Sequence, residues 1–220
     1  MSKIIWDAVG ERLYETGVDR GVVYPMVGAA YPKGEGWNGL TNVTLTPSGA
    51  EASPLYANNT KYLNLMSVEE LGGTIEAYTY PDSFAVCNGL KELVPGVRAA
   101  QQKRTPFGFT FRTLIGNDTE GTNHGYKITL VWGAMASPSE QSSATVNEDP
   151  EAKTMSWEFS ATPVELTGFD PVSSLEIDST KIDPEKLKAL EDMLYGTEDA
   201  DPQLPMPNEV AALVGYTAQA

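Results

Sequence analysis

The sequence predicts a mainly β protein with one helix packed on its sheet. Residues 107–112, 126–132 and 155–161 alternate apolar, mostly aromatic side chains with polar ones. This period of two is typical of strands with one buried face. The polar, Gly-rich stretch 116–125 separates the first two runs, so we expect them to form a pair of long antiparallel strands. The helix is predicted over residues 183–195.

The first half of the chain predicts shorter elements. Apolar positions spaced four apart in residues 4–16 are consistent with either a short helix or an extended arm. Residues 84–93 are mixed and favour a helical turn. Short strands bounded by prolines are predicted over residues 22–24, 37–47 and 74–80.

Residues 48–72 show no period, and a stretch of this length without structure is usually functional or disordered. Its aromatic and leucine side chains, Tyr56 and Tyr62 among them, argue against simple disorder. Two interpretations stay open. The segment is either a surface for a partner or a loop folded over its own core.

The helix prediction rests on its two ends and one face. Asp183 is a favourable N-cap, Pro184 suits the first helical position, and Gly196 suits the stop. One stripe of leucines is expected to pack on the sheet: Leu187, Leu190 and Leu194.

The segments around this helix are predicted from composition and pattern. Residues 175–178 indicate a strand with a carboxylate face. Residues 197–207 are acidic and proline-rich, which favours an exposed strap, and residues 210–214 favour a short terminal strand.

The charge of the protein disfavours nucleic-acid binding. The net charge is −15, and residues 140–220 carry 17 acidic and 4 basic side chains against 13 and 11 in residues 1–139. Affinity for DNA comes largely from neutralising phosphates with Lys and Arg. We therefore expect this protein to repel DNA.

Catalytic and metal-binding patterns are missing from the sequence. Cys87 is the only cysteine and His124 the only histidine, so neither a disulfide nor a cysteine-based metal site is expected. Nucleotide-binding and nucleophile-elbow motifs are absent. We expect no enzyme activity, no cofactor and no metal, and a catalytic interpretation would rest on the abundance of carboxylates alone.

Hydropathy indicates a protein made inside a cell. The sequence has no run of eighteen apolar residues, which a membrane span requires. The N-terminal segment scatters charges among its apolar residues, unlike the h-region of a signal peptide.

Several short blocks occur in order between about residues 4 and 210. They are residues 6–21 (WDAVGERLYETGVDRG), 37–41 (WNGLT), 56–80, 112–118 (RTLIGND), 124–127 (HGYK), 136–140 (ASPSE) and 157–164 (WEFSATPV). Together these blocks resemble the major tail protein family, the tail tube subunits of long-tailed phages and prophages. Residues 95–106 depart from the family pattern.

The resemblance implies a tail-tube-type β-sandwich or partial barrel with a flanking helix, formed as a single domain over residues 1–220. It further implies an N-terminal arm at 1–20, an inter-ring loop at 48–72 and a C-terminal arm at 197–220. Hexameric rings of such subunits stack into a tube through which DNA is ejected. The family also implies synthesis in the host bacterial cytoplasm and a final location in the virion tail. Expected partners are further copies of the chain and the tape-measure, tail-terminator and baseplate or distal tail proteins.

Two sets of residues follow as candidates for this role. The inter-ring candidates are Ser53, Tyr56, Asn58, Lys61, Tyr62, Leu63, Leu65 and Met66. The candidates for acidic groups facing the channel are Glu76, Glu158, Glu176 and Asp178.

The polar side of the long strand pair has its own expectation. Thr110, Arg112, Lys127 and Thr129 are expected to line the channel or a contact between subunits. For Arg112 and Lys127 a carboxylate of a neighbouring subunit is the expected partner.

Two alternatives to the tail tube stay open. A tube of a phage-tail-like particle that carries no DNA would have the same sequence features. A β-sandwich module that binds carbohydrate or a cell surface would need aromatic side chains gathered on one face, with Tyr62, Tyr78 and Tyr80 as candidates.

Overall fold

The computed structural model describes residues 4–143, 145 and 152–216. Within them, one antiparallel sheet of eight strands has the order β2-β1-β9-β10-β11-β6-β3, and β12 pairs with β10. The strands of this sheet are β1 (Tyr14–Pro25), β2 (Glu35–Gly36), β3 (Leu40–Ser48), β6 (Glu70–Ala77), β9 (Phe107–Asn117), β10 (Gly121–Ala136), β11 (Met155–Ala161) and β12 (Ser174–Asp178). The predicted mainly β class is confirmed.

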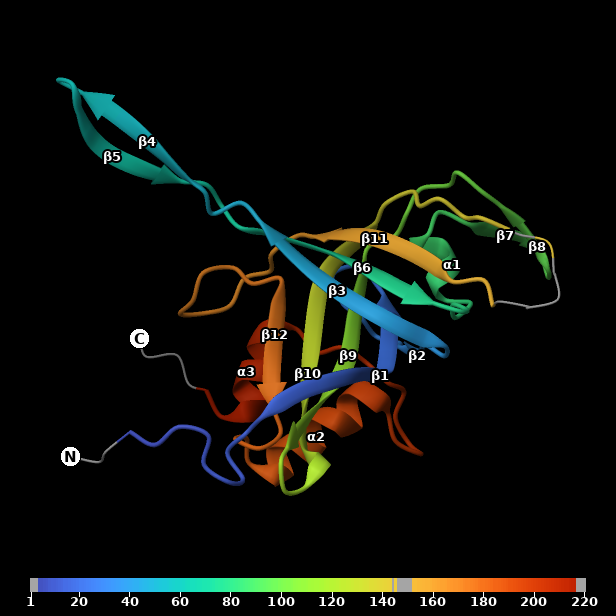
Figure 1. Cartoon of the computed structure of the whole chain (residues 1–220). Helices are drawn as coiled ribbons and strands as arrows, with labels where there is room; N and C mark the ends of the chain where they lie inside the picture. The colour runs from blue at the N-terminus through green and yellow to red at the C-terminus, as the bar shows by residue number, and fades with distance from the viewer. Residues whose placement is uncertain (1–3, 144, 146–151, 217–220) are drawn as a thin grey trace.

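Two separate hairpins and three helices complete the described structure. The hairpins are β4 (Ala52–Ala57) with β5 (Thr60–Met66), and β7 (Lys91–Val94) with β8 (Val97–Ala99). The helices are α1 (Phe84–Cys87), α2 (Pro184–Tyr195) and α3 (Pro207–Val214). In Figure 1 the layer β3-β6-β11 crosses the layer β1-β9-β10-β12, and α2 and α3 cover the far side of the second layer.

A bend in β10 lets one sheet form two layers. Its pairing with β9 shifts register between Val131 and Ala134, and it pairs with β11 only from Ala134 to Ala136. Gly133 lies inside this bulge at a φ of 62°, where a Cβ would lie 2.4 Å from the carbonyl oxygen of Thr162. A side chain at this position is therefore excluded by both conformation and space.

The core between the two layers contains the aromatic residues of two alternating runs, 107–112 and 155–161, whereas Trp132 of the run 126–132 is buried in a second core. The rings of Trp37, Phe84 and Trp157 pack with centroids 4.6 to 5.5 Å apart. Phe107, Phe109, Phe111 and Phe159 are buried in the same core. Such tilted and edge-to-face packing fits the quadrupoles of aromatic rings.

A second core lies between the other face of the strands and the helices. Leu187, Leu190 and Leu194 of α2 are buried there against side chains of β10, as the leucine stripe predicted. The hydroxyl of Tyr24 on β1 donates to the carbonyl of Leu194 at 2.6 Å, and Trp132 Nε1 donates to the carbonyl of Pro205 at 2.9 Å. These bonds connect the sheet to the ends of the helical layer.

The predicted helix is confirmed together with its N-cap, because an oxygen of Asp183 accepts from the backbone N–H of Glu185 at 2.9 Å. One other terminal prediction is wrong, because residues 210–214 belong to helix α3 and not to a strand. Residues 4–13 contain no helix, which agrees with the extended arm of the two interpretations, and β1 begins at Tyr14.

Candidate assembly surfaces

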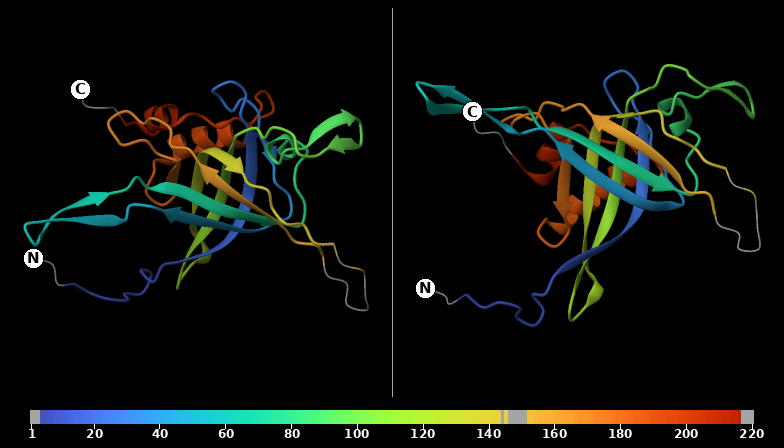
Figure 2. Two further views of the ribbon diagram at one scale, coloured as in Figure 1. Left: turned by 90° about the horizontal axis from the view of Figure 1, so that it is seen from above. Right: turned by 45° about the horizontal axis from the view of Figure 1, so that its top comes forward.

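The segment 48–72 is a long hairpin, so the prediction of an aperiodic loop is wrong. β3 and β6 continue beyond the sandwich as β4 and β5, which pair from Ala52↔Met66 to Ala57↔Thr60. Every residue of β4 and β5 is exposed. Figures 1 and 2 show this β4–β5 hairpin projecting away from both layers.

The turn of the β4–β5 hairpin explains why it forms. Asn58 and Asn59 have φ values of 50° and 65°, as the two central residues of a type I′ turn do. Asparagine is one of the few side chains that tolerate this conformation. The Asn-Asn pair was therefore the sequence signal for a hairpin, and the candidate Asn58 shapes the turn.

Both faces of the β4–β5 hairpin carry large apolar side chains. Leu55 and Leu63 are cross-strand partners, and Ser53 pairs with Leu65, so these four side chains share one face. All of them except Leu55 belong to the inter-ring candidates. Tyr62 and Met66 fall on the alternate positions of β5 and are 72% and 65% exposed. The candidates Tyr56 and Lys61 pair across the strands near the tip.

The β4–β5 hairpin joins the sandwich through a bend. Gly49 and Ala50 have φ values of 86° and 53°, and a Cβ on Gly49 would lie 2.3 Å from the carbonyl oxygen of Val68. Across the bend, Ser67 Oγ accepts from the backbone N–H of Glu51 at 3.2 Å. The close approach of the two strands therefore requires glycine at position 49.

Two of the four acidic candidates share the outer face of β3, β6 and β11. Glu76 pairs with Ser156 and Asn42, and Glu158 pairs with Thr74, so both carboxylates stand on one side of the layer. Asn42 Nδ2 donates to Glu76 Oε2 at 3.1 Å. We call this the polar face; its positions are Asn42, Thr44, Thr46, Ser48, Glu70, Gly72, Thr74, Glu76, Ser156, Glu158 and Ser160.

The other two acidic candidates lie on β12, in the layer that carries the helices. Glu176 forms an ion pair of 2.9 Å with Lys127. Asp178 is partly buried, which raises its pKa, but hydrogen bonds from Thr180 and Lys181 outweigh burial and lower the pKa to about 2. The structure therefore does not bring the four acidic candidates together.

The basic residues of the long strand pair have partners within the chain. Arg112 donates two hydrogen bonds to Asp19, at 2.7 and 2.6 Å. Lys127 contacts Glu15 as well as Glu176. The carboxylates expected from a neighbouring subunit are therefore supplied within the chain. The two threonines of this set, Thr110 and Thr129, are buried, so the prediction that they line a channel or a subunit contact is wrong.

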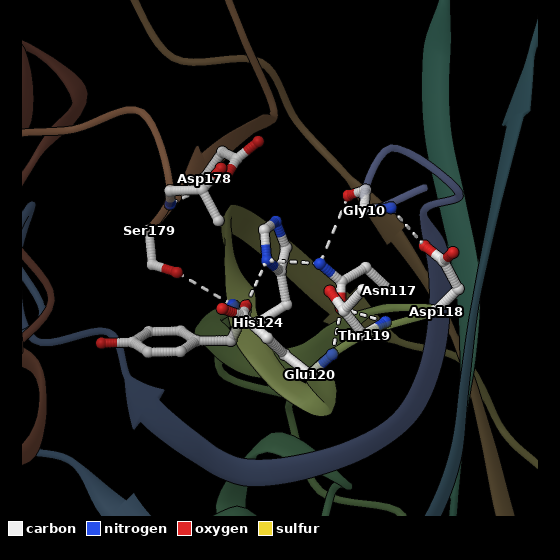
Figure 3. Close-up of polar contacts among 10 residues, drawn as sticks. Gly10, Asn117, Asp118, Thr119, Glu120, His124, Asp178 and Ser179 are labelled. Atoms are coloured by element: carbon white, nitrogen blue, oxygen red, sulfur yellow. Dashed lines mark hydrogen bonds and ion pairs between the residues drawn. The ribbon is translucent and has the colours of Figure 1, made fainter. Parts of the chain in front are cut away.

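The turn between β9 and β10 holds the N-terminal arm, as Figure 3 shows. Asp118 Oδ1 accepts from the N–H of Gly10 at 2.9 Å, and Asn117 Nδ2 donates to the carbonyl of Gly10 at 3.3 Å. His124 Nδ1 lies 2.8 Å from a carboxylate oxygen of Glu120 in the same turn. This histidine therefore helps to order a turn.

The described residues contain no group of three or more His, Cys, Asp or Glu side chains placed to hold a metal ion. Cys87 is buried in the sandwich core, and this burial raises the pKa of its thiol to about 12, which disfavours the reactive thiolate.

The three tyrosines proposed for a carbohydrate site do not gather. Tyr62 lies on the β4–β5 hairpin, whereas Tyr78 follows the opposite end of β6. The ring of Tyr80 packs against Phe84 and Trp157 at the core. These side chains cannot form one aromatic platform.

No protein-family model matches the chain, and a search of curated proteins finds no match either. None of the helices in the described ranges is long and apolar enough to cross a membrane.

Proposed function

We propose that this protein is a structural subunit that polymerises into stacked hexameric rings, forming the tail tube of a phage. The observation that carries the proposal is the β4–β5 hairpin. Its two faces expose leucine, tyrosine and methionine side chains to solvent, and an isolated two-stranded hairpin is at best marginally stable in water. An exposed apolar surface of this kind marks a contact with another protein.

The edges of the sheet support self-assembly. Among the described residues β3 pairs only with β6, so its outer backbone groups lack a strand partner. Closed rings pair such edges between identical subunits, which protects them from uncontrolled aggregation.

The polar face supports a role as the wall of a DNA channel. Its described positions include three carboxylates and no Lys or Arg, among Asn, Ser, Thr and Gly residues. A surface of this composition repels phosphates, which supply most of the affinity of proteins for DNA. In the proposed tube, DNA passes along this face without being bound.

Electron microscopy of the concentrated, purified protein tests the proposal. We expect hollow tubes built of stacked rings. A matched variant replaces residues 53–65 by Asn-Gly, which closes a two-residue turn between the cross-strand partners Ala52 and Met66. This variant should stay folded, as measured by circular dichroism, and should form no tubes.

A control variant separates the loss of the hairpin from a general loss of apolar surface. Val27→Ser changes a valine that is 66% exposed on a loop outside β4 and β5, and it should form tubes like the parent protein. A parent protein that stays monomeric at high concentration would contradict the proposed function.

A further inference from the structure

A second exposed hairpin, β7–β8, lies at the opposite end of the sandwich from the β4–β5 hairpin. β6 begins beside β5 at Glu70, and the chain leaves its other end at Ala77 to form α1 and then β7. Figures 1 and 2 agree that the two hairpins project in opposite directions. Leu93, Val94 and Val97 of β7–β8 are 68%, 56% and 53% exposed.

We propose that the β7–β8 hairpin is the surface on which the β4–β5 hairpin of a second copy docks. This inference rests on the proposed function and names the two contacting surfaces. Because the surfaces lie at opposite ends of one chain, a single molecule cannot satisfy both. A contact between unlike surfaces of identical molecules does not form a closed two-fold dimer; it gives an open stack when no rotation closes it into a ring.

Charge complementarity favours a second copy as the occupant. The protein carries −15 overall, but residues 88–106 hold four basic side chains and one acidic, a net of +3. Residues 48–72 hold three acidic side chains at the base of the β4–β5 hairpin, Glu51, Glu69 and Glu70, and one basic side chain within it, Lys61, a net of −2. Opposite charges on the two ends steer them together and disfavour contact between like ends.

The cations available for this contact are lysines. Arg98 is bound to Asp82 at 2.7 Å, and Arg104 donates to the carbonyl of Ala136 at 2.8 Å. Lys91 and Lys103 are exposed and contact no carboxylate among the described residues. At the base of the β4–β5 hairpin, Glu51, Glu69 and Glu70 are exposed in the same way.

The β7–β8 hairpin is held in place before docking. The N–H of Gln102 donates to the carbonyl of Gly89 at 3.0 Å, which closes the base of the hairpin. The N–H of Leu90 donates to the carbonyl of Ala85 in α1 at 2.8 Å. A surface fixed in this way loses little conformational freedom on binding.

Disulfide trapping tests the contact directly. Single variants Tyr62→Cys and Leu93→Cys are mixed in equal amounts, allowed to assemble and oxidised; the native Cys87 is buried and stays inert. We expect the mixed disulfide to exceed both homodimers at least fivefold by mass spectrometry. A control mixture of Tyr62→Cys with Phe169→Cys, which is 61% exposed elsewhere, should give no such excess.

Charge exchange provides a second readout. Lys91→Glu with Lys103→Glu should reduce the polymer formed, measured by sedimentation, at least tenfold. Adding Glu51→Lys and Glu69→Lys to the same chain should restore the amount of polymer, because the charges at the two surfaces are then exchanged. The inference is overturned if the mixed disulfide forms no more often than random pairing predicts and the Lys91→Glu, Lys103→Glu variant forms as much polymer as the parent protein. If the parent protein still forms tubes in that case, the proposed function stands; if it forms none, the proposed function fails separately.

Discussion

The contacts of Arg112 depend on strand pairing between segments that are far apart in the sequence. Its guanidinium binds both carboxylate oxygens of Asp19 and lies 4.9 Å from the centroid of the Tyr126 ring. The hydrogen bonds to Asp19 raise the pKa of Arg112 and lower the pKa of the carboxyl group. Because β1 and β9 lie far apart in the sequence, periodicity alone placed Arg112 on a polar side but supplied no partner.

Replacing Asp19 by Asn should destabilise the protein by about 1–2 kcal/mol at pH 7, because Arg112 is mostly buried and loses a charged acceptor. The exposed fractions of 15% for Arg112 and 43% for Asp19 keep the loss below that of a fully buried pair. Urea unfolding of both proteins measures the difference.

The same pair has a pH dependence with a defined sign. A carboxyl group with a lowered folded pKa stabilises the protein above its unfolded pKa, near 4, and this contribution is lost as pH falls through the folded value. The gap between the parent and Asp19→Asn should therefore close below about pH 4. Asp192→Asn, which removes an exposed pair with Lys188, serves as the control and should change stability little at any pH. A gap that does not shrink as the pH falls below 4 would contradict this account.

At the scale of elements, local signals decided which predictions succeeded. Helix α2 carries its own N-cap and leucine stripe, and both were readable without knowing the fold. Helix α3 was read as a strand because residues 210–214 are short and mostly apolar. Its start depends on Pro207 and on Glu209, whose carboxylate accepts from the N–H of Met206 at 2.8 Å. This contact spans only three residues, so the sequence already contained the signal for the start of helix α3.

The N-cap of α2 gives a prediction at this scale. Asp183→Ala should cost about 1 kcal/mol of unfolding free energy, because two backbone N–H groups of the first turn lose their acceptor. Asp183→Asn keeps an acceptor and should restore most of the loss. Thermal unfolding followed by circular dichroism compares the three proteins, and equal losses for Ala and Asn would refute the capping role.

The bend at the base of the β4–β5 hairpin gives a second prediction at the scale of elements. Gly49→Ala should reduce tube formation at least tenfold while the sandwich stays folded, because the new Cβ meets the carbonyl of Val68 and forces the hairpin to change direction. Gly28→Ala is the matched control: its φ is 66°, but nothing lies within 4 Å of the added Cβ. Electron microscopy at equal concentration compares them. If both variants lost tube formation equally, the contact between the new Cβ and Val68 would not explain the effect of Gly49→Ala.

For the whole molecule, the sequence predicted the class of fold, the aromatic core and one helix, but not the grouping of surface residues. Glu76, Glu158, Glu176 and Asp178 all alternate with apolar positions, so periodicity treats them alike. Only strand order separates the first two, on the polar face, from the second two, on β12. Strand order depends on pairings between distant segments, which no short window of sequence contains.

The polar face leads to a prediction about DNA. Tubes assembled from Glu76→Lys, Glu158→Lys protein in the presence of duplex DNA should protect DNA from nuclease, and protection should fall as salt rises. Tubes of the parent protein should protect none. The same charge change on the exposed strap, Glu198→Lys with Asp199→Lys, is the control. Equal protection by the control would contradict the assignment of the polar face to the channel.

The strand β1 has a consequence for how the protein folds. Val23 is buried in the core between the layers, while its neighbours Val22 and Tyr24 are buried in the core under the helices. A slip of one residue would exchange the contents of the two cores, so neither core can form correctly before the strand registers are set. The sandwich and the helices should therefore melt in one cooperative transition, with equal calorimetric and van't Hoff enthalpies.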